Sequence, residues 1–374
     1  MALKICFRAD ASLQIGTGHV MRCLTLADAL VTRGADCQFL CREHQGNLIE
    51  LIRNKGYIVH VLAARTEPDA VEESSLAIKA ASGEQGLAHS HWLGATQAED
   101  AEACIPILAA LQPDWLIVDH YALDACWEQI LKRHSRKLMV IDDLVDRLHI
   151  CDLLLDQTFG RQSEDYRAWV PDHCRLLCGS QYALLRPEFA VLRAYSLERR
   201  VTPQLRKLLI TMGGVDKDNA TGQVLEALRN SPPPAGCRIT VVMGATAPWL
   251  DDVRNQAQGM PWPTRVLVGV DDMAQLMADS DLAIGAAGST SWELCCLGVP
   301  SLLICTAANQ RTVIAALASA SATVELDQAA LSEPDAAQFR AQHVELMDNL
   351  EAYAVAAARV TDGCGASRVC AQLV

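Results

Sequence analysis

Short apolar runs alternate with longer segments of helical spacing along this 374-residue chain, and the alternation restarts near residue 207. This rhythm is typical of a parallel sheet with helices on both faces, because parallel strands need a crossover connection. The restart predicts two such sheets, one in each half of the chain. The expected strands are 4–7, 37–40, 58–62, 115–118, 138–141, 153–155 and 175–178, and then 207–212, 238–243, 264–267, 282–284 and 301–304.

The restart also sets the expected domains. We expect residues 1–190 to form an N-terminal Rossmann-like domain and residues 203–350 to form a C-terminal one, with a ligand cleft between them. Residues 351–374 are expected to form a helix that packs back on the N-terminal domain. An insertion at about 67–102 interrupts the rhythm. Its histidines at 89 and 91 have no third metal ligand nearby, so we interpret it as surface elaboration.

Charge and cysteine content exclude several classes of function. Acidic residues outnumber basic ones by 45 to 32, for a net charge of −13, which argues against a nucleic-acid or anionic-membrane partner. The expected partner is a small anionic molecule held by backbone N–H groups and a few cations. The fifteen cysteines contain no C-x-x-C spacing. We therefore expect free thiols in a reducing cytoplasm and no zinc ribbon.

A glycine loop with a histidine follows the first expected strand. Gly16, Gly18 and His19 lie between the apolar run 3–7 and an amphipathic segment at 20–30. Such a loop directs N–H groups and a helix dipole at a ligand, most often a phosphate, although its spacing matches neither G-x-G-x-x-G nor a Walker loop. The dipole favours a neutral imidazole, so we interpret His19 as a general base. Helix capping is the alternative.

Polar residues stand where other strands of the first half end. Asp119 and Tyr121 follow one apolar run and Asp142 follows the next. The carboxyl ends of parallel strands form the ligand crevice of an open sheet, so these residues are candidates for a binding site. Strand-end carboxylates also commonly cap the next helix, and the sequence leaves that alternative open.

The second half carries two further glycine loops. Gly213 and Gly214 follow its first strand. Ser289 and Thr290 follow a run of small residues at 285–288, at a predicted helix N-terminus suited to a diphosphate. Glu293, one turn on, can accept both hydroxyls of a ribose. The alternative is that Glu293 serves only a capping box.

These motifs together resemble a known family. The second half resembles the nucleotide-binding domain of GT-B enzymes related to MurG-type N-acetylglucosaminyltransferases. The whole set of motifs resembles the UDP-2,4-diacetamido-2,4,6-trideoxy-β-L-altropyranose hydrolases of pseudaminic acid biosynthesis. The motifs are 8–24, 118–121, 141–143, 156–157, 182–189 and 212–216.

The resemblance implies an α/β fold of the GT-B type and an inverting attack of water on the anomeric carbon, which releases UDP. It implies no cofactor and no metal, and the sequence has no D-x-D-like motif that would require one. The implied site residues are His19 as the catalytic base; Asp10, Gly16, Gly18, Arg22, Asp119, Tyr121 and Asp142 on the sugar side; and Gly213, Gly214, Gly288, Ser289, Thr290, Glu293 and Asn309 for UDP.

Two other functions use the same features. A GT-B glycosyltransferase would direct His19 at an acceptor hydroxyl instead of water, and fold alone does not separate the two. A transferase with a membrane-bound acceptor would carry an apolar and basic patch, whereas residues 60–110 are Ala-rich and acidic. A non-catalytic nucleotide-sugar sensor would not need His19. We expect a monomeric hydrolase.

Overall fold

The computed structural model describes residues 2–64, 87–306, 310–331 and 336–374. Residues 67–86 of the predicted insertion and the predicted UDP ligand Asn309 lie outside these ranges. The chain divides into two compact units. Unit 1 comprises Met1–Asp156, Gln162–Cys178 and Val369–Val374, and unit 2 comprises Gln157–Arg161 and Gly179–Arg368.

Unit 1 is built on a seven-stranded sheet in the order β3-β2-β1-β4-β5-β6-β7, with every neighbouring pair parallel. Its central strands are buried along nearly their whole length, which explains why they are continuous apolar runs in the sequence. The strands are β1 Lys4–Ala9, β2 Asp36–Arg42, β3 Ile58–Leu62, β4 Trp115–Asp119, β5 Lys137–Ile141, β6 Leu153–Asp156 and β7 Arg175–Cys178.

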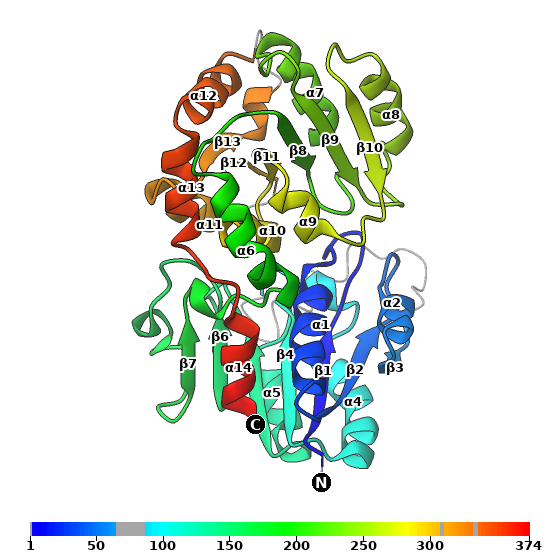
Figure 1. Ribbon diagram of the computed structural model, residues 1–374. Helices are drawn as coiled ribbons and strands as arrows, with labels where there is room; N and C mark the ends of the chain where they lie inside the picture. Colours follow the sequence, from blue (N-terminus) through cyan, green and yellow to red (C-terminus); the bar gives the residue numbers. More distant parts are fainter. Residues whose placement is uncertain (1, 65–86, 307–309, 332–335) are drawn as a thin grey trace. The chain divides into compact units, whose positions relative to one another are not determined.

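Helices cover the sheet of unit 1, and α1 packs against β1 and β2 (Figure 1). The α-helices are α1 Gly18–Val31, α2 Ile49–Asn54, α4 Gln97–Leu111 and α5 Ala125–Leu131, and the 3₁₀ turns are η1 Ser90–Leu93, η2 Lys132–His134 and η3 Ser163–Tyr166. The last residues of the chain join this unit, where the Trp115 indole N–H donates to the Leu373 carbonyl at 3.0 Å.

The strand order of unit 1 fixes where a ligand can bind. The order reverses between β1 and β4, which lie side by side with Ala9 opposite Asp119. The connections after these two strands run to opposite sides, which opens a crevice at their carboxyl ends. The loop at residues 10–17 and the residues just after Asp119 lie at this point.

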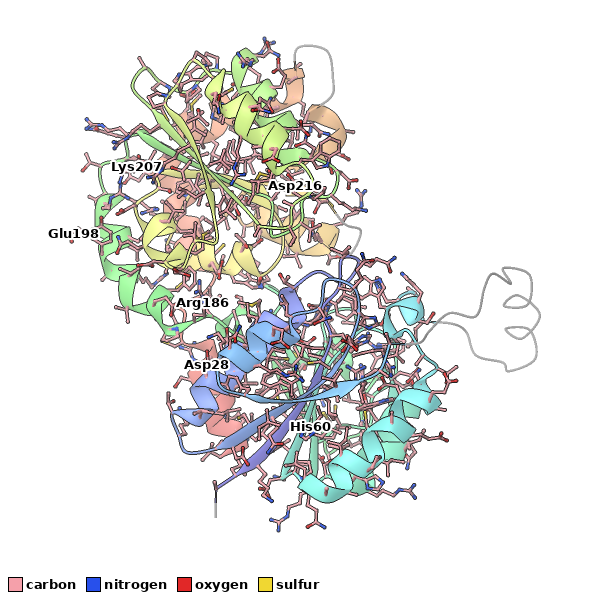
Figure 2. The ribbon with its side chains drawn as sticks, turned by 90° about the vertical axis from the view of Figure 1, so that its right-hand side faces the viewer. Asp28, His60, Arg186, Glu198, Lys207 and Asp216 are labelled. Atoms are coloured by element: carbon pink, nitrogen blue, oxygen red, sulfur yellow. The ribbon has the colours of Figure 1, made fainter. Side chains whose placement is uncertain are left out.

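Unit 2 repeats the design with a six-stranded sheet in the order β10-β9-β8-β11-β12-β13, again with every neighbouring pair parallel. The strands are β8 Lys207–Thr211, β9 Arg238–Met243, β10 Thr264–Val268, β11 Leu282–Ala286, β12 Ser301–Cys305 and β13 Val324–Asp327. Figure 2 shows Lys207 at the start of β8 and Asp216 beyond its end.

The helices of unit 2 lie on both faces of this sheet and bury two apolar clusters against it. They are α6 Pro187–Arg199, α7 Ala220–Asn230, α8 Leu250–Gln258, α9 Met273–Ala278, α10 Ser289–Cys296, α11 Arg311–Ser319, α12 Ala337–Asp348 and α13 Leu350–Ala358, with 3₁₀ turns η4 Ser180–Tyr182 and η6 Gln328–Leu331. The last helix, α14 Gly365–Leu373, only begins in unit 2. The end of α14 belongs to unit 1.

The predicted fold class of two parallel α/β sheets is confirmed. Each predicted strand is present, with its ends moved by at most a few residues. The edge strand β13 was not predicted. It has four residues, two of them the acidic Glu325 and Asp327, so it lacks the continuous apolar run of a buried strand.

Candidate active site

His19 is the second residue of α1, and its side chain is nearly buried, with 9% exposed. The loop before it is shaped by Gly16, whose φ of +79° falls in the left-handed region that glycine adopts without strain. Gly18 has open space where a Cβ would stand, since no atom lies within 4 Å of that point. A ligand can therefore approach the backbone at the start of α1.

A single short hydrogen bond fixes the protonation pattern of His19. Its Nδ1 lies 2.6 Å from Asp119 Oδ1 at the end of β4. An ionised carboxylate only accepts hydrogen bonds, so Nδ1 carries the proton and donates it. In the neutral ring this leaves Nε2 as the nitrogen with a free lone pair. The tautomer is the one that a general base needs.

Arg22 keeps Asp119 ionised. One turn beyond His19 on α1, its Nε donates to Asp119 Oδ2 and its Nη2 to Asp119 Oδ1, both at 2.6 Å. Burial alone would raise the pKa of Asp119, but the Arg22 guanidinium and His19 outweigh burial and hold that pKa well below its usual range. Asp119 is therefore a carboxylate at neutral pH.

Tyr121 supports the imidazole from the side. Its ring meets the His19 ring edge-on, with centroids 4.6 Å apart and planes at 86°. Its hydroxyl donates to Asp143 Oδ1 at 2.5 Å, and Arg22 Nη1 donates to the other oxygen of Asp143 at 3.0 Å. Burial, followed by the Asp143 carboxylate, raises the pKa of Tyr121 well above its usual value, so the phenol stays protonated.

Asp10 directly follows β1, at the start of the glycine loop, and is fully buried. Its Oδ1 accepts from Arg8 Nη1 at 2.6 Å and from the Arg42 backbone N–H at 2.7 Å, and its Oδ2 lies 3.3 Å from His120 Nε2. Burial would raise the pKa of Asp10, but Arg8 and the hydrogen bonds of His120 and His44 hold it well below its usual range. The carboxylate joins the end of β1 to β2 and to His120.

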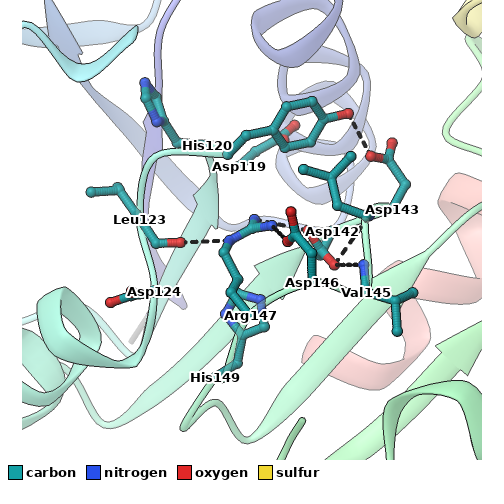
Figure 3. Close-up of polar contacts among 12 residues, drawn as sticks. Asp119, His120, Leu123, Asp124, Asp142, Asp143, Val145, Asp146, Arg147 and His149 are labelled. Carbon is teal, nitrogen blue, oxygen red and sulfur yellow. Dashed lines mark hydrogen bonds and ion pairs between the residues drawn. The ribbon is translucent and has the colours of Figure 1, made fainter. Parts of the chain in front are cut away.

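Asp142 is committed to the loop that follows β5. Its Oδ2 accepts from the Tyr166 hydroxyl at 2.8 Å and from the Val145 N–H at 3.1 Å, and its Oδ1 pairs with Arg147 at 2.8 Å. Arg147 also donates to the Leu123 carbonyl at 2.9 Å, which ties this loop to the segment after β4 (Figure 3). Asp142 is 1% exposed.

The structure thus brings His19, Arg22, Asp119 and Tyr121 into one cluster at the carboxyl edge of the sheet, beside Gly16 and Gly18. Asp10 and Asp142 are buried close by. Asp143 was not predicted to belong to the site, although it immediately follows Asp142, which was. Asp143 could have been identified from its position at the end of a strand. Adjacent residues there point in different directions, so both Asp142 and Asp143 were candidates.

Sequence reasoning also passed over Trp92 and His89, which stand close to this cluster. The Trp92 ring is stacked near Tyr121, with centroids 5.7 Å apart. The pair was interpreted as part of a surface insertion, and no local pattern in the sequence indicates which residues of an insertion fold inward.

In unit 2, the two predicted glycine loops follow neighbouring strands, β8 and β11, at the point where the strand order reverses. Gly213 and Gly214 follow β8, and Gly288 precedes α10 after β11. Gly285 allows the two strands to pair closely, because a Cβ there would stand 2.8 Å from the Thr211 carbonyl oxygen. The loops therefore lie side by side at the carboxyl edge of this sheet.

The N-terminus of α10 is open. Gly288 N–H donates to Ser291 Oγ at 3.3 Å, so Ser291 and not Glu293 caps the helix. Gly288 and Ser289 are exposed and Thr290 is half-buried. Among the residues that the structure describes, neither the Ser289 nor the Thr290 hydroxyl has a hydrogen-bond partner.

Glu293 is half-buried one turn into α10 and makes no hydrogen bond through its carboxylate within the described ranges. Burial raises its pKa to about 7, and the Arg186 guanidinium opposes that effect. A carboxylate without a partner in a desolvated position is poised to accept hydroxyl donors when a ligand supplies them.

Two absences hold for the described part of the chain. No group of three or more His, Cys, Asp or Glu side chains there is arranged to hold a metal ion. No helix in those ranges is long and apolar enough to span a membrane.

Comparison with known proteins supports the predicted resemblance. The chain is 27% identical over 324 residues to the UDP-2,4-diacetamido-2,4,6-trideoxy-beta-L-altropyranose hydrolase of Campylobacter jejuni subsp. jejuni serotype O:2, covering 86% of this chain and 99% of that protein. It is 28% identical over 222 residues, 53% of this chain and 62% of the relative, to a UDP-N-acetylglucosamine–N-acetylmuramyl-(pentapeptide) pyrophosphoryl-undecaprenol N-acetylglucosamine transferase of Chromobacterium violaceum. No protein-family model matches the chain.

Among solved structures, the MurG of Acinetobacter baumannii aligns with a TM-score of 0.67, covering 99% of both chains at 14% identity. At that identity the likeness bears on the fold alone. It confirms the predicted GT-B architecture of two Rossmann-like domains.

Proposed function

We propose that this chain, which is similar along most of its length to a UDP-sugar hydrolase, hydrolyses a UDP-linked amino sugar at its anomeric carbon. The observation that carries the proposal is the His19–Asp119 pair, at 2.6 Å, on the loop and strand end where an open α/β sheet binds ligands. The similarity to the Campylobacter hydrolase supports this substrate class.

In the proposed reaction, a water oxygen forms a bond to the anomeric carbon while His19 Nε2 takes one of its protons. The bond between the anomeric carbon and the bridging oxygen breaks, and UDP leaves with the electron pair. The anomeric configuration is inverted because water attacks from the face opposite UDP. Asp119 stabilises the imidazolium that forms, as the carboxylate partner of a catalytic histidine does. UDP is an acidic leaving group, so the step needs no general acid.

We assign the UDP-binding role to unit 2. The N–H groups near Gly213, Gly214, Ser289 and Thr290 would bind the diphosphate and stabilise its growing charge as preorganised donors. Glu293 would accept the ribose hydroxyls. The open N-terminus of α10 and the unpartnered Glu293 carboxylate support this assignment.

The finer identity of the reaction belongs to the same proposal. The substrate would be UDP-2,4-diacetamido-2,4,6-trideoxy-β-L-altrose, and the free sugar would enter pseudaminic acid biosynthesis and, through it, bacterial surface polysaccharide or flagellin glycosylation. The fifteen cysteines are all free thiols, which supports a reducing compartment such as the cytoplasm. We propose a monomer as the working unit.

Release of UDP without any acceptor tests this proposal against the glycosyltransferase alternative. That alternative is retained because the chain is also similar to the Chromobacterium transferase. Purified protein is incubated with the UDP-diacetamido sugar in buffer alone, and UDP is quantified by chromatography. A hydrolase releases stoichiometric UDP, and its His19→Asn variant does not. UDP release that requires an added sugar or lipid acceptor would replace the hydrolase with a transferase.

A further inference from the structure

The proposed base His19 and three other aromatic side chains form a continuous cluster. His19 meets Tyr121 edge-on at 4.6 Å, and the Tyr121 ring lies 5.7 Å from Trp92 at an interplanar angle of 27°. His89 closes the cluster, with centroids 4.3 Å from Trp92 and 5.4 Å from Tyr121. The Trp92 and His19 centroids are 6.4 Å apart. All four residues belong to unit 1.

Trp92 is held firmly from its C-terminal side. It lies in η1, and the next residue, Leu93, is 1% exposed in the core of the unit. The turn ends at Gly94, whose φ of +67° is left-handed and where a Cβ would stand 2.9 Å from the His44 ring. Thr96 then starts α4 with a capping box. The position of the indole is therefore determined by the fold.

The indole retains a free donor. Trp92 is half-buried, and its indole N–H has no acceptor among the residues that the structure describes. Trp side chains usually use this N–H when they are buried, so an unpaired one beside a candidate catalytic group is available to a ligand. Burial lowers the pKa of the adjacent His89, which favours its neutral form. The Arg147 guanidinium lies over the Tyr121 ring, 5.8 Å from its centroid.

We propose that Trp92, backed by Tyr121 and His89, is a subsite for the sugar and selects its N-acetyl and deoxy groups. The ring face would pack against a methyl group, and the indole N–H would donate to an acetamido carbonyl oxygen. This inference rests on the proposed function, which places the anomeric carbon at His19. The separation of 6.4 Å between the two rings leaves Trp92 within reach of a substituent on that sugar. An aromatic wall with one N–H donor favours acetamido sugars over hydroxylated ones.

The test measures binding without turnover. In the His19→Asn background, calorimetry gives the affinities for UDP and for the UDP-diacetamido sugar, and their ratio is the contribution of the sugar. Trp92→Ala removes the ring and the donor, and Trp92→Phe keeps the ring and removes the donor. Wild-type UDP release is measured in parallel, so that a failure of the hydrolase proposal is seen separately.

We expect Trp92→Ala to reduce the sugar contribution about tenfold, equivalent to about 1.4 kcal/mol, with the affinity for UDP unchanged. Trp92→Phe is expected to lose only part of it. For UDP-N-acetylglucosamine, which has one acetamido group and a C6 hydroxyl, the loss in Trp92→Ala is expected to be smaller. The subsite is refuted if the sugar contribution is the same in Trp92→Ala and its parent, or is absent from the parent. A hydrolase with an unaltered sugar contribution would keep the function and overturn the subsite.

Discussion

The proton on Nδ1 of His19 determines which nitrogen can act as a base. Asp119 Oδ1 lies 2.6 Å from Nδ1 and accepts the hydrogen bond of that proton, and Arg22 keeps Asp119 ionised. Asp119→Asn can present an amide N–H instead of an acceptor, which reverses the tautomer and leaves Nε2 protonated. We expect kcat for UDP release to fall by about 1000-fold with little change in KM, because the loss falls on proton transfer.

Asp143→Asn is the matched control for this variant. Asp143 shares Arg22 with Asp119 and accepts from Tyr121, but it has no bond to His19. We expect a reduction in kcat of less than about tenfold. Thermal unfolding of both variants shows whether they remain folded. Equal losses in the two folded variants would contradict the assigned role of Asp119.

The proposed role of Glu293 in binding UDP predicts that this binding depends on pH. Its pKa of about 7 means that the carboxylate is largely protonated below that pH in the free protein. A protonated carboxyl cannot accept both ribose hydroxyls, so we expect affinity for UDP to weaken as the pH falls from 8 to 6. Calorimetry at pH 6, 7 and 8 measures the trend. In Glu293→Gln the affinity is expected to be weak and to lose this part of its pH dependence.

Glu188→Gln is a control that is expected to shift the pH dependence of UDP binding instead of removing it. The Glu188 carboxylate contributes to the raised pKa of Glu293, so its removal lowers that pKa. The weakening of UDP binding is then expected at a lower pH, with affinity at pH 8 unchanged. The ionisation of UDP itself is common to all three proteins and cancels in their comparison. Identical pH profiles in wild type and Glu293→Gln would refute the role of Glu293.

Among the elements, α4 links the aromatic cluster to the buried ion pairs of unit 1. Its capping box consists of the Thr96 hydroxyl accepting from Glu99 N–H at 3.2 Å and Glu99 Oε2 accepting from Thr96 N–H at 2.8 Å. Asp100, in the first turn, then binds Arg8 and Arg42. We expect Thr96→Ala to lower the free energy of unfolding by about 1 kcal/mol, measured by chemical denaturation.

Thr32→Ala is a suitable comparison for the cap. Thr32 follows α1, where its hydroxyl only donates to the Ala29 carbonyl at 2.7 Å in an exposed position. We expect a change within about 0.5 kcal/mol. A loss in Thr96→Ala no larger than that in Thr32→Ala would mean that the capping box does not stabilise α4.

All strands but β13 were predictable because the sheets are parallel and largely buried on both faces, so that these strands are mostly apolar runs such as Leu153–Leu155. The glycine loops were predictable because each follows such a run directly. Two features depended on long-range contacts and left no local pattern. Asp119 was selected for its strand-end position, but only the fold brings it within hydrogen-bond distance of His19 on α1. Trp92 reaches the same site from a segment with no periodicity.

At the scale of the whole molecule, the two units respond differently to acid. Four buried carboxylates of unit 1, those of Asp10, Asp100, Asp119 and Asp142, have a pKa lowered by neighbouring guanidinium groups against the effect of burial. Each such group contributes stability above its unfolded pKa, about 3.9, and loses it as the pH falls through the lower folded pKa. Glu293 in unit 2 has the opposite sign: its contribution is complete below its unfolded pKa and is lost as the pH rises through about 7.

We therefore expect acidification below about pH 4 to destabilise unit 1 before unit 2. The unit 2 carboxylates with a lowered pKa, Asp279 and Asp362, are partly exposed and contribute less. Hydrogen exchange followed by mass spectrometry at decreasing pH measures the two units separately. Protection is expected to be lost first in peptides from β1, β4 and β5. Earlier loss in the strands of unit 2 would contradict this account of the buried charges.

The central claim is that His19 activates a water molecule to attack the anomeric carbon. The most direct test follows hydrolysis of UDP-2,4-diacetamido-2,4,6-trideoxy-β-L-altrose in ¹⁸O-water, with mass spectrometry of both products. If His19 activates water to attack the anomeric carbon, one ¹⁸O enters the sugar and none enters UDP, and His19→Asn abolishes the reaction. Label in the phosphate of UDP would mean that water attacks phosphorus, which would contradict the mechanism.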